Sequence, residues 1–307
     1  MRDLKERNFK MPSQTKNNKG TADTTGALEN IPSSYFWIDN FKYPEGVRIA
    51  VNFTIDFDAQ LNRRLRNEPI MELAKGEFGG RVGIWRILDL FDKHKVKLTI
   101  FTPGRICELY PDALKEAAKL GNELANHTWE HRVPSEFDLE KDHLLKATDA
   151  IENVCQKRPV GSRSGHKISL LKQEGYIYQS FNCADDIPYY ICDDNQKCVL
   201  NLPLHLVLDD AMYFSFAWFG SVNAGQRLEE PGKVLDIWLS AFSRLYKSGS
   251  YMNIVLHPFV SGRSLRIEML DQLIFEMKKR PGVWFPTCEE LAQYCISNFA
   301  PQIDKRY

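Results

Sequence analysis

The chain has 307 residues, and its 40 Lys and Arg residues balance its 40 Asp and Glu residues, so the formal net charge is zero. This balance excludes a strong general attraction to nucleic acid or to an anionic membrane, and 43% hydrophobic with 26% charged residues is typical of a globular protein. No run of about 18 apolar residues occurs, so we expect no transmembrane helix and no membrane partner.

The first part of the chain is polar and rich in Lys, Asn, Thr and Gly. It lacks the apolar core of a secretory signal, which predicts a cytoplasmic protein with an N-terminal extension over residues 1–45. A folded domain is expected over 46–300 and a short tail over 301–307. The aromatic stretch 35–37 could dock on the domain or on a neighbouring molecule.

Short apolar runs then alternate with patterns of helical periodicity. Strands are predicted over 47–55, 96–101, 122–126, 158–161, 176–182, 199–203 and 251–256, and helices over 81–94, 111–120, 138–156, 167–174, 231–248, 264–279 and 287–297. This alternation predicts an α/β fold with a parallel sheet. The glycine-containing stretch 71–83 is predicted to be a loop that crosses the mouth of a barrel.

Polar residues follow the ends of many of these strands. They include Asp56, Asp58, His127, His131, Arg163, Asp185, Asp186, His205 and His257. A (β/α) barrel builds its site from the carboxyl ends of several strands, whereas an open sheet concentrates it at one switch point. The distribution favours a barrel.

The seven cysteines are scattered and form no CxxC pair, so a zinc knuckle or a thioredoxin-like site is not expected. Core or free thiols in a reducing compartment are the simplest interpretation. Cys192 and Cys198 could bridge a short loop, but only an oxidising compartment would favour that bond.

Three fragments fit one metal site. Asp56 and Asp58 point to the same side if the chain is extended, and His127 and His131 have a spacing that a helix or tight turn can direct at one ion. Each fragment also has a simpler interpretation: a solvated strand end, a pair of exposed histidines, and, for His257, a core residue with its hydrogen bonds satisfied. One carboxylate and two imidazoles suit a divalent metal such as zinc, and a spare Asp and His could move protons.

Taken in order, four motifs resemble those of the polysaccharide deacetylase (NodB-homology, carbohydrate esterase 4) superfamily. They are Thr54-Ile55-Asp56-Phe57-Asp58, His127-x3-His131, Arg158-Pro159-Val160-Gly161-Ser162-Arg163 and Leu256-His257-Pro258. The segments 78–86 and 257–263 resemble the branch with PuuE-type allantoinases, cyclic imide hydrolases and a Helicobacter-type peptidoglycan deacetylase. Two departures are Phe57, which splits the family's usual Asp-Asp pair, and Ser164-Gly165-His166, where a proline is common.

The resemblance implies a deformed (β/α)7 barrel. It also implies that Asp58, His127 and His131 hold the metal, that Asp56 is the general base and that His257 is the general acid. Arg163 is similar to the arginine that pairs with the base. Relatives in this branch include tetramers, so a homo-oligomer is expected.

The implied function is hydrolysis of a non-peptide C–N bond, in which a metal-bound water attacks an amide carbonyl. A small cyclic amide, imide or ureide suits a closed pocket, and the alternative is N-deacetylation of an N-acetylated sugar or peptidoglycan. Expected substrate contacts are Glu77, Arg81, Asp186 and Trp218. A degenerate barrel that only binds a ligand would not need both a base and an acid, and a nucleic-acid binder would need a basic patch that is missing.

Overall fold

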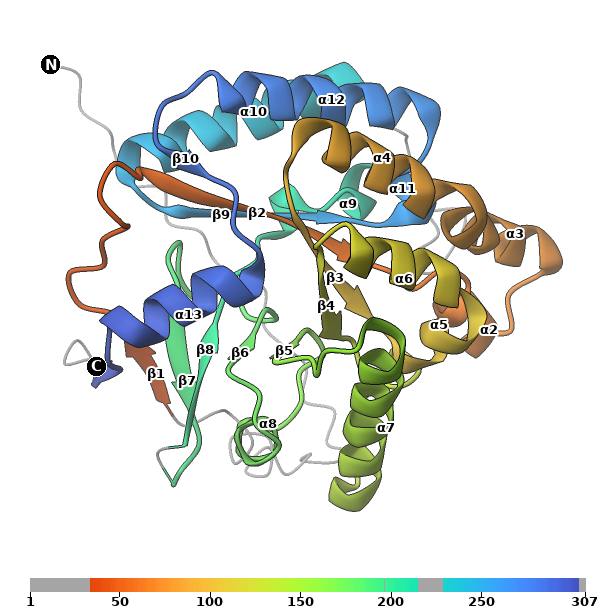
Figure 1. Cartoon of the computed structure of the whole chain (residues 1–307), viewed down its shortest axis with the longest axis horizontal. Helices are drawn as coiled ribbons and strands as arrows, with labels where there is room; N and C mark the ends of the chain where they lie inside the picture. The colour runs from red at the N-terminus through yellow and green to blue at the C-terminus, as the bar shows by residue number, and fades with distance from the viewer. Residues whose placement is uncertain (1–33, 196, 215–228, 304–307) are drawn as a thin grey trace, which may run out of the picture.

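A computed structural model describes residues 34–195, 197–214 and 229–303. Its centre is a curled parallel sheet in which the strands are ordered β9 (Tyr251–Leu256), β2 (Ile49–Asp56), β3 (Leu98–Thr102), β4 (Glu123–Asn126), β5 (Gly161–Ser162), β6 (Tyr178–Gln179) and β8 (Cys198–Asn201). Short β10 (Val283–Trp284) runs parallel beside the start of β2. The predicted deformed barrel is confirmed (Figure 1).

The barrel is closed by a segment that is not a regular strand. After β8 the chain passes through a 3-10 turn (Leu206–Leu208) and runs beside β9, where Asp209 forms a parallel bridge with Val255 and the Asp210 N–H donates to the Val255 carbonyl at 3.0 Å. The side-chain amide of Asn253 also donates to the Pro203 carbonyl, at 3.3 Å. This segment therefore brings its residues to the C-terminal end of β9.

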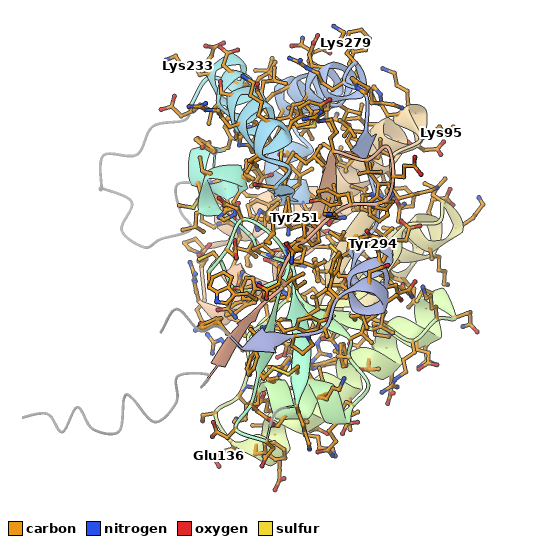
Figure 2. All side chains as sticks on the ribbon, turned by 90° about the vertical axis from the view of Figure 1, so that its left-hand side faces the viewer. Lys95, Glu136, Lys233, Tyr251, Lys279 and Tyr294 are labelled. Atoms are coloured by element: carbon orange, nitrogen blue, oxygen red, sulfur yellow. A yellow bond between two sulfur atoms is a disulfide. The ribbon has the colours of Figure 1, made fainter. Side chains whose placement is uncertain are left out.

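Most helices cover the outside of the sheet (Figure 1), whereas the last one, over residues 288–298, packs against the inner-face residues Ala50 and Tyr251. In chain order the helices are α2 (Leu61–Leu65), α3 (Ile70–Phe78), α4 (Ile84–His94), α5 (Gly104–Leu109), α6 (Pro111–Lys119), α7 (Phe137–Cys155), α8 (Ile168–Gln173), α9 (Ala211–Phe214), α10 (Pro231–Ser248), α11 (Pro258–Ser261), α12 (Ser264–Lys278) and α13 (Cys288–Asn298). None of the helices in the described ranges is both long and apolar enough to cross a membrane. Charged side chains such as Lys95, Lys233 and Lys279 lie at the outer edge, whereas Tyr251 is in the interior (Figure 2).

The two faces of β2 have different chemistry because side chains alternate along a strand. Ile49, Val51, Phe53 and Ile55 point outward into the apolar core beneath the helices. On the inner face, Asn52 bonds to the Pro286 carbonyl and the Tyr251 hydroxyl, and Thr54 bonds to Asn253. The same alternation places the Asp56 carboxylate at the end of a polar barrel interior.

Both ends of the chain take part in the sheet within the described residues. Strand β1 (Ser34–Trp37) pairs antiparallel with β7 (Tyr189–Cys192) and with β11 (Gln302–Ile303). Ile38 is buried in the core, and the Tyr43 hydroxyl donates to the Ser250 carbonyl at 2.9 Å. Residues 34–45 and 302–303, which the sequence assigned to the extension and the tail, therefore pack on the domain. The aromatic stretch 35–37 could dock on the domain or on a neighbouring molecule, and in the structure it lies on the domain.

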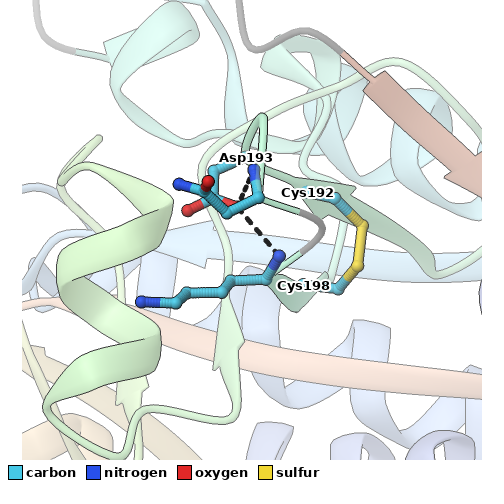
Figure 3. Close-up of a disulfide and its surroundings, with 5 residues drawn as sticks. Cys192, Asp193 and Cys198 are labelled. Atoms are coloured by element: carbon cyan, nitrogen blue, oxygen red, sulfur yellow. Dashed lines mark hydrogen bonds between the residues drawn. A yellow bond between two sulfur atoms is a disulfide. The ribbon is translucent and has the colours of Figure 1, made fainter.

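Cys192 and Cys198 form a disulfide across the β7–β8 hairpin, where they are directly opposite each other (Figure 3). The Asp193 side chain accepts hydrogen bonds from the Asn195 and Lys197 N–H groups, at 3.0 and 2.8 Å, and so orders the connecting loop. Among the described residues the other five cysteines are free. The preferred interpretation, free thiols, is therefore wrong for this pair, and the alternative, a bridge across a short loop, is the one found.

The predicted loop over 71–83 is also wrong. The segment is helical: α3 continues into a π-helical turn (Gly79–Gly83) and then into α4. The glycines of this segment allow its backbone to contact the backbone of α11. A Cβ on Gly79 would lie 2.9 Å from the Phe259 nitrogen, and one on Gly83 would collide with the Pro258 carbonyl oxygen of α11. The sequence pattern suggested a loop because this tertiary contact is invisible along the chain.

We expect the substitution Gly83→Ala to lower the free energy of unfolding by about 2 kcal/mol, because overpacking at a backbone contact forces the two helical segments apart. Urea denaturation measures the effect. Gly232→Ala is the matched control, since its Cβ would meet only the flexible Glu230 carboxylate. That variant should keep the wild-type value or gain up to about 1 kcal/mol. Equal stability of the two variants would contradict the packing role of Gly83.

Candidate metal and proton-transfer site

The C-terminal ends of β2 and β4 bring Asp58, His127 and His131 together. Asp58 Oδ1 lies 3.5 Å from His127 Nε2, and Asp58 Oδ2 lies 3.4 Å from His131 Nε2. The two imidazole rings are 4.6 Å apart and nearly perpendicular. Asp58 is fully buried and His127 almost so. The three groups offer ligand atoms close enough to hold one ion.

A tight turn, not a helix, positions the two histidines. Thr128 and His131 both have left-handed backbone conformations, with φ of 59° and 60°. The N–H groups of Gly104 and Arg105 at the start of α5 donate to the Thr128 and Trp129 carbonyls, at 2.9 and 3.0 Å. The side-chain oxygen of Asn126 accepts from the Thr128 N–H at 2.7 Å. These bonds fix the turn, so both imidazoles face Asp58.

The hydrogen-bonding pattern of the trio fits a divalent metal. The Nδ1 atom of His127 bonds to the Arg163 carbonyl, which places the proton there and leaves the Nε2 lone pair facing Asp58. His127 Nε2 and Asp58 Oδ1 are buried without a hydrogen-bond partner among the described residues. Burial lowers the pKa of His127, which favours the neutral imidazole that a metal requires. Asn62 adds a hydrogen bond to Asp58 Oδ2 at 3.3 Å.

Asp56 lies beside the trio and is paired with Arg163. Arg163 Nη1 donates to Asp56 Oδ1 at 2.7 Å, and Asp56 Oδ2 lies 3.9 Å from His127 Nε2. Burial alone would raise the pKa of this carboxyl group, but the Arg163 charge outweighs it with help from nearby histidines, and the pKa falls to about 2. Asp56 is therefore ionised at neutral pH, with one oxygen held by Arg163 and the other facing the trio.

His257 is held by a carboxylate that the sequence reasoning missed. Asp210, fully buried, accepts from His257 Nδ1 at 2.7 Å and from the His257 N–H at 2.9 Å, and it also accepts from the Ser261 hydroxyl. Burial would lower the pKa of His257, but the negative charge of Asp210 and its hydrogen bond raise the pKa to about 10. His257 is therefore a cation at neutral pH, within electrostatic reach of Asp56.

A pocket of about 390 Å³ lies beside the site, and neither Asp58 nor His257 is among the residues that line it. Its polar lining includes Asp56, His127, His131, Arg163 and Asp209, and its apolar lining is formed by Val133, Phe181, Leu204, Leu206 and Val255. Volumes of this size are typical of small-molecule sites. The pocket is therefore where a substrate would meet the trio.

Three of the expected substrate contacts do not line this pocket. Glu77 accepts from the Tyr110 hydroxyl at 2.6 Å and from Gln60 at 3.0 Å, and Arg81 is exposed on the π-helical turn. Asp186 pairs with His205 at 3.2 Å, and its carbonyl accepts from the Tyr251 N–H at the other end of β9. The prediction placed Asp186 at the rim with the other strand ends. It is wrong for this residue because the chain between β6 and β9 turns back, which no local pattern shows. Trp218 lies outside the described residues.

His166, the extra titratable group after Arg163, has a structural environment. Its Nδ1 lies 3.2 Å from Glu140 Oε1, and the Lys167 N–H also donates to that oxygen, at 2.8 Å. Burial would raise the pKa of Glu140, but these bonds lower it to about 2. The carboxylate therefore ties the segment after β5 to helix α7.

Comparisons with known proteins agree with this fold. The sequence model of the polysaccharide deacetylase family matches residues 78–172. A Helicobacter pylori protein named peptidoglycan deacetylase is 26% identical over 280 residues, covering 80% of this chain and 95% of its own. A Mycobacterium smegmatis structure assigned to the polysaccharide deacetylases has a TM-score of 0.79 at 26% identity, over 90% of this chain and 99% of its own. PuuE allantoinase shares the fold, with a TM-score of 0.75 at 23% identity, over 85% of this chain and 95% of its own.

Fold and site thus define a hydrolase that acts on C–N bonds other than peptide bonds. Residues 78–172 match the sequence model of the polysaccharide deacetylases, the family that the four sequence motifs resemble, and the whole fold is similar to structures assigned to that family. Enzymes of this family depend on a metal, and the trio is a group that could hold one.

We expect Asp58→Asn to abolish stoichiometric binding of a divalent metal, because it removes the one anionic ligand of the trio. Asp56→Asn should keep the metal, since Asp56 lies farther from the imidazoles and is already paired with Arg163. Metal content after dialysis, measured by atomic emission, distinguishes the two. Loss of metal from both variants to the same extent would contradict this division of roles.

Proposed function

We propose that this protein hydrolyses an amide-type C–N bond, with Asp58, His127 and His131 as metal ligands, Asp56 as general base and His257 as general acid. One observation carries the proposal: beside the same trio the structure holds an ionised carboxylate, paired with Arg163, and a charged imidazole, paired with Asp210. Hydrolysis of an amide needs one group to take a proton from water and another to give a proton to the leaving nitrogen.

A divalent metal, for which one carboxylate and two imidazoles make zinc the best fit, would supply Lewis-acid polarisation of the carbonyl and lower the pKa of the attacking water. The protein's own residues then divide the proton transfers. Asp56 accepts the proton of the attacking water through the oxygen that Arg163 leaves open. Arg163 keeps that carboxylate ionised and correctly oriented through four further hydrogen-bonding and ring contacts.

His257 gives its proton to the leaving nitrogen. Asp210 bonds to Nδ1 and to the backbone N–H of the same residue, which directs the Nε2–H away from Asp210. The raised pKa ensures that this proton is present at neutral pH. A site that only bound a ligand would not need both proton-transfer pairs, which argues against a degenerate barrel.

The substrate that suits the pocket best is a small cyclic amide, imide or ureide. Support comes from the volume of about 390 Å³ and from the apolar wall around Phe181, Leu204, Leu206 and Val255. Compact apolar pockets with a few convergent polar groups are typical of small-molecule sites. Segment 71–83, predicted to be a loop across the mouth of the barrel, is helical and gives no support for this choice of substrate.

N-deacetylation of an N-acetylated sugar or of peptidoglycan is the second candidate. It is favoured by the names of the similar proteins, which include the Helicobacter pylori peptidoglycan deacetylase and a peptidoglycan deacetylase-like protein of Gibberella zeae that is 25% identical over 293 residues. Both reactions require the same proton transfers, so the residue roles above hold for either.

A substrate screen tests the proposal. The purified protein is assayed with hydantoin, succinimide, allantoin and N-acetylglucosamine oligomers, with and without a chelator. We expect turnover of at least one small cyclic substrate that the chelator abolishes and that falls by about 10²–10⁴-fold in Asp56→Asn, because the general base is lost. Activity on the oligomers alone would replace the small-substrate assignment with deacetylation, and undiminished turnover by Asp56→Asn would remove the base assignment.

The substitution Asp210→Asn tests the role of His257 as the general acid. Asp210 raises the pKa of His257 to about 10, so the imidazolium is present below that pH and is lost above it. Without the Asp210 charge the pKa falls, and we expect the alkaline limb of the kcat/KM profile to move to lower pH. Asp149→Asn on the exposed side of α7 is the charge-matched control. An alkaline limb at the wild-type pH in Asp210→Asn would contradict the role of the pair.

A further inference from the structure

Two adjacent carboxylates, Asp209 and Asp210, reach the site from the segment that closes the barrel, and their surroundings differ. Asp210 is fully buried and takes the direct bonds to His257 and Ser261. Asp209 lines the pocket, with its side chain 19% exposed. Since Asp210 already satisfies His257 Nδ1 and the backbone N–H, Asp209 is not required to orient the acid.

Backbone groups hold Asp209 in place. Its Oδ1 accepts from the Ala211 N–H at 2.8 Å, and its backbone forms the parallel bridge with Val255 of β9. The same oxygen lies 3.7 Å from His257 Nδ1. Among the described residues no hydrogen bond is made to its second oxygen. Asp209 is therefore a fixed carboxylate with an open acceptor that lines the pocket and lies beside the His257 imidazole.

Apart from the charged groups of His257, Asp210 and Asp56, the neighbours of Asp209 are apolar: its backbone bonds to Leu206 and bridges to Val255. A carboxylate in such surroundings is costly unless a hydrogen-bond donor meets it. Burial raises the pKa of Asp209 to about 6 even though His257 opposes the shift. Oδ1 of Asp209 already accepts from the Ala211 N–H, and a ligand N–H would supply a donor for the second oxygen.

We propose that Asp209 is a specificity-determining residue that accepts a hydrogen bond from an N–H of the substrate next to the scissile carbonyl. The inference rests on the proposed function and deepens it, because it selects compact amides, imides or ureides that carry such an N–H. Cyclic imides and ureides present this donor beside the carbonyl within one ring, which matches a single carboxylate beside the acid. N-methylation of the substrate removes the donor and leaves the carbonyl in place.

Hydantoin and its N-methyl derivatives test the proposal with the metal-loaded full-length enzyme. For the wild type we expect kcat/KM on hydantoin to exceed that on at least one N-methyl derivative by about 10- to 100-fold, the usual value of a hydrogen bond to a charged group. Asp209→Asn should lower kcat/KM on hydantoin by a similar factor, chiefly through KM, and should leave the value on that derivative nearly unchanged. Asn can keep the bond to the Ala211 N–H, because Asn and Asp side chains both accept from the backbone two residues further on. Asp149→Asn is the charge-matched control.

The outcomes separate this inference from the proposed function. If the wild type turns over hydantoin but Asp209→Asn discriminates as well as the wild type, the inference is wrong and the proposed function stands. A uniform loss of kcat on every substrate, with a shifted alkaline limb, would also overturn it, since Asp209 would then act only through His257. Turnover confined to N-acetylglucosamine oligomers would overturn both substrate assignments. Metal content and thermal unfolding verify that the Asp209→Asn variant is folded. If it is not folded, Asp209→Ser is used in its place.

Discussion

The guanidinium of Arg163 is the group on which the rest of the site depends. It is almost fully buried, donates to Thr54 and Asp56 of β2 and to Ser180 after β6, and stacks at 4.0 Å on Phe101 of β3. Its own backbone carbonyl accepts from His127 after β4. One residue therefore connects four strand ends. A buried charge without partners costs several kcal/mol. The positions of these partners around the guanidinium are therefore strongly constrained.

This constraint explains how the barrel keeps charges of both signs in a dry interior. The inner faces of β2 and β9 carry polar side chains that bond to one another, and the outer faces carry the apolar core. At the C-terminal ends, the network terminates in Asp56 with Arg163 and in His257 with Asp210. Each pair moves the pKa of its reactive member away from neutrality, one downward and one upward. Opposite shifts within one site are the arrangement that general base and general acid catalysis require.

The differences between expectation and structure have physical causes. Segment 71–83 looked like a loop because glycine is a poor helix former, yet its glycines let two helical segments touch at the backbone. Asp209 and Asp210 carried no signal because they follow a short irregular segment, and only the closure of the barrel places them beside β9. The cysteine pair could be read as free or bonded until the β7–β8 register set the two residues opposite each other.

The sequence by itself determined the alternating order of strands and helices, the parallel barrel, and the residues Asp56, Asp58, His127, His131, Arg163 and His257 as one site. The order of elements and the preference for a barrel follow from local rules, namely period-two and helical patterns and polar residues directly after apolar strands. The six site residues follow from those rules together with motifs that resemble the polysaccharide deacetylases. Only the tertiary structure decided that Asp210 holds His257, that Asp209 faces the pocket and that Glu77 and Asp186 do not. Those outcomes depend on which segments far apart in the chain come into contact. Hydrogen bonds between such segments produce no periodic pattern of residues in the sequence.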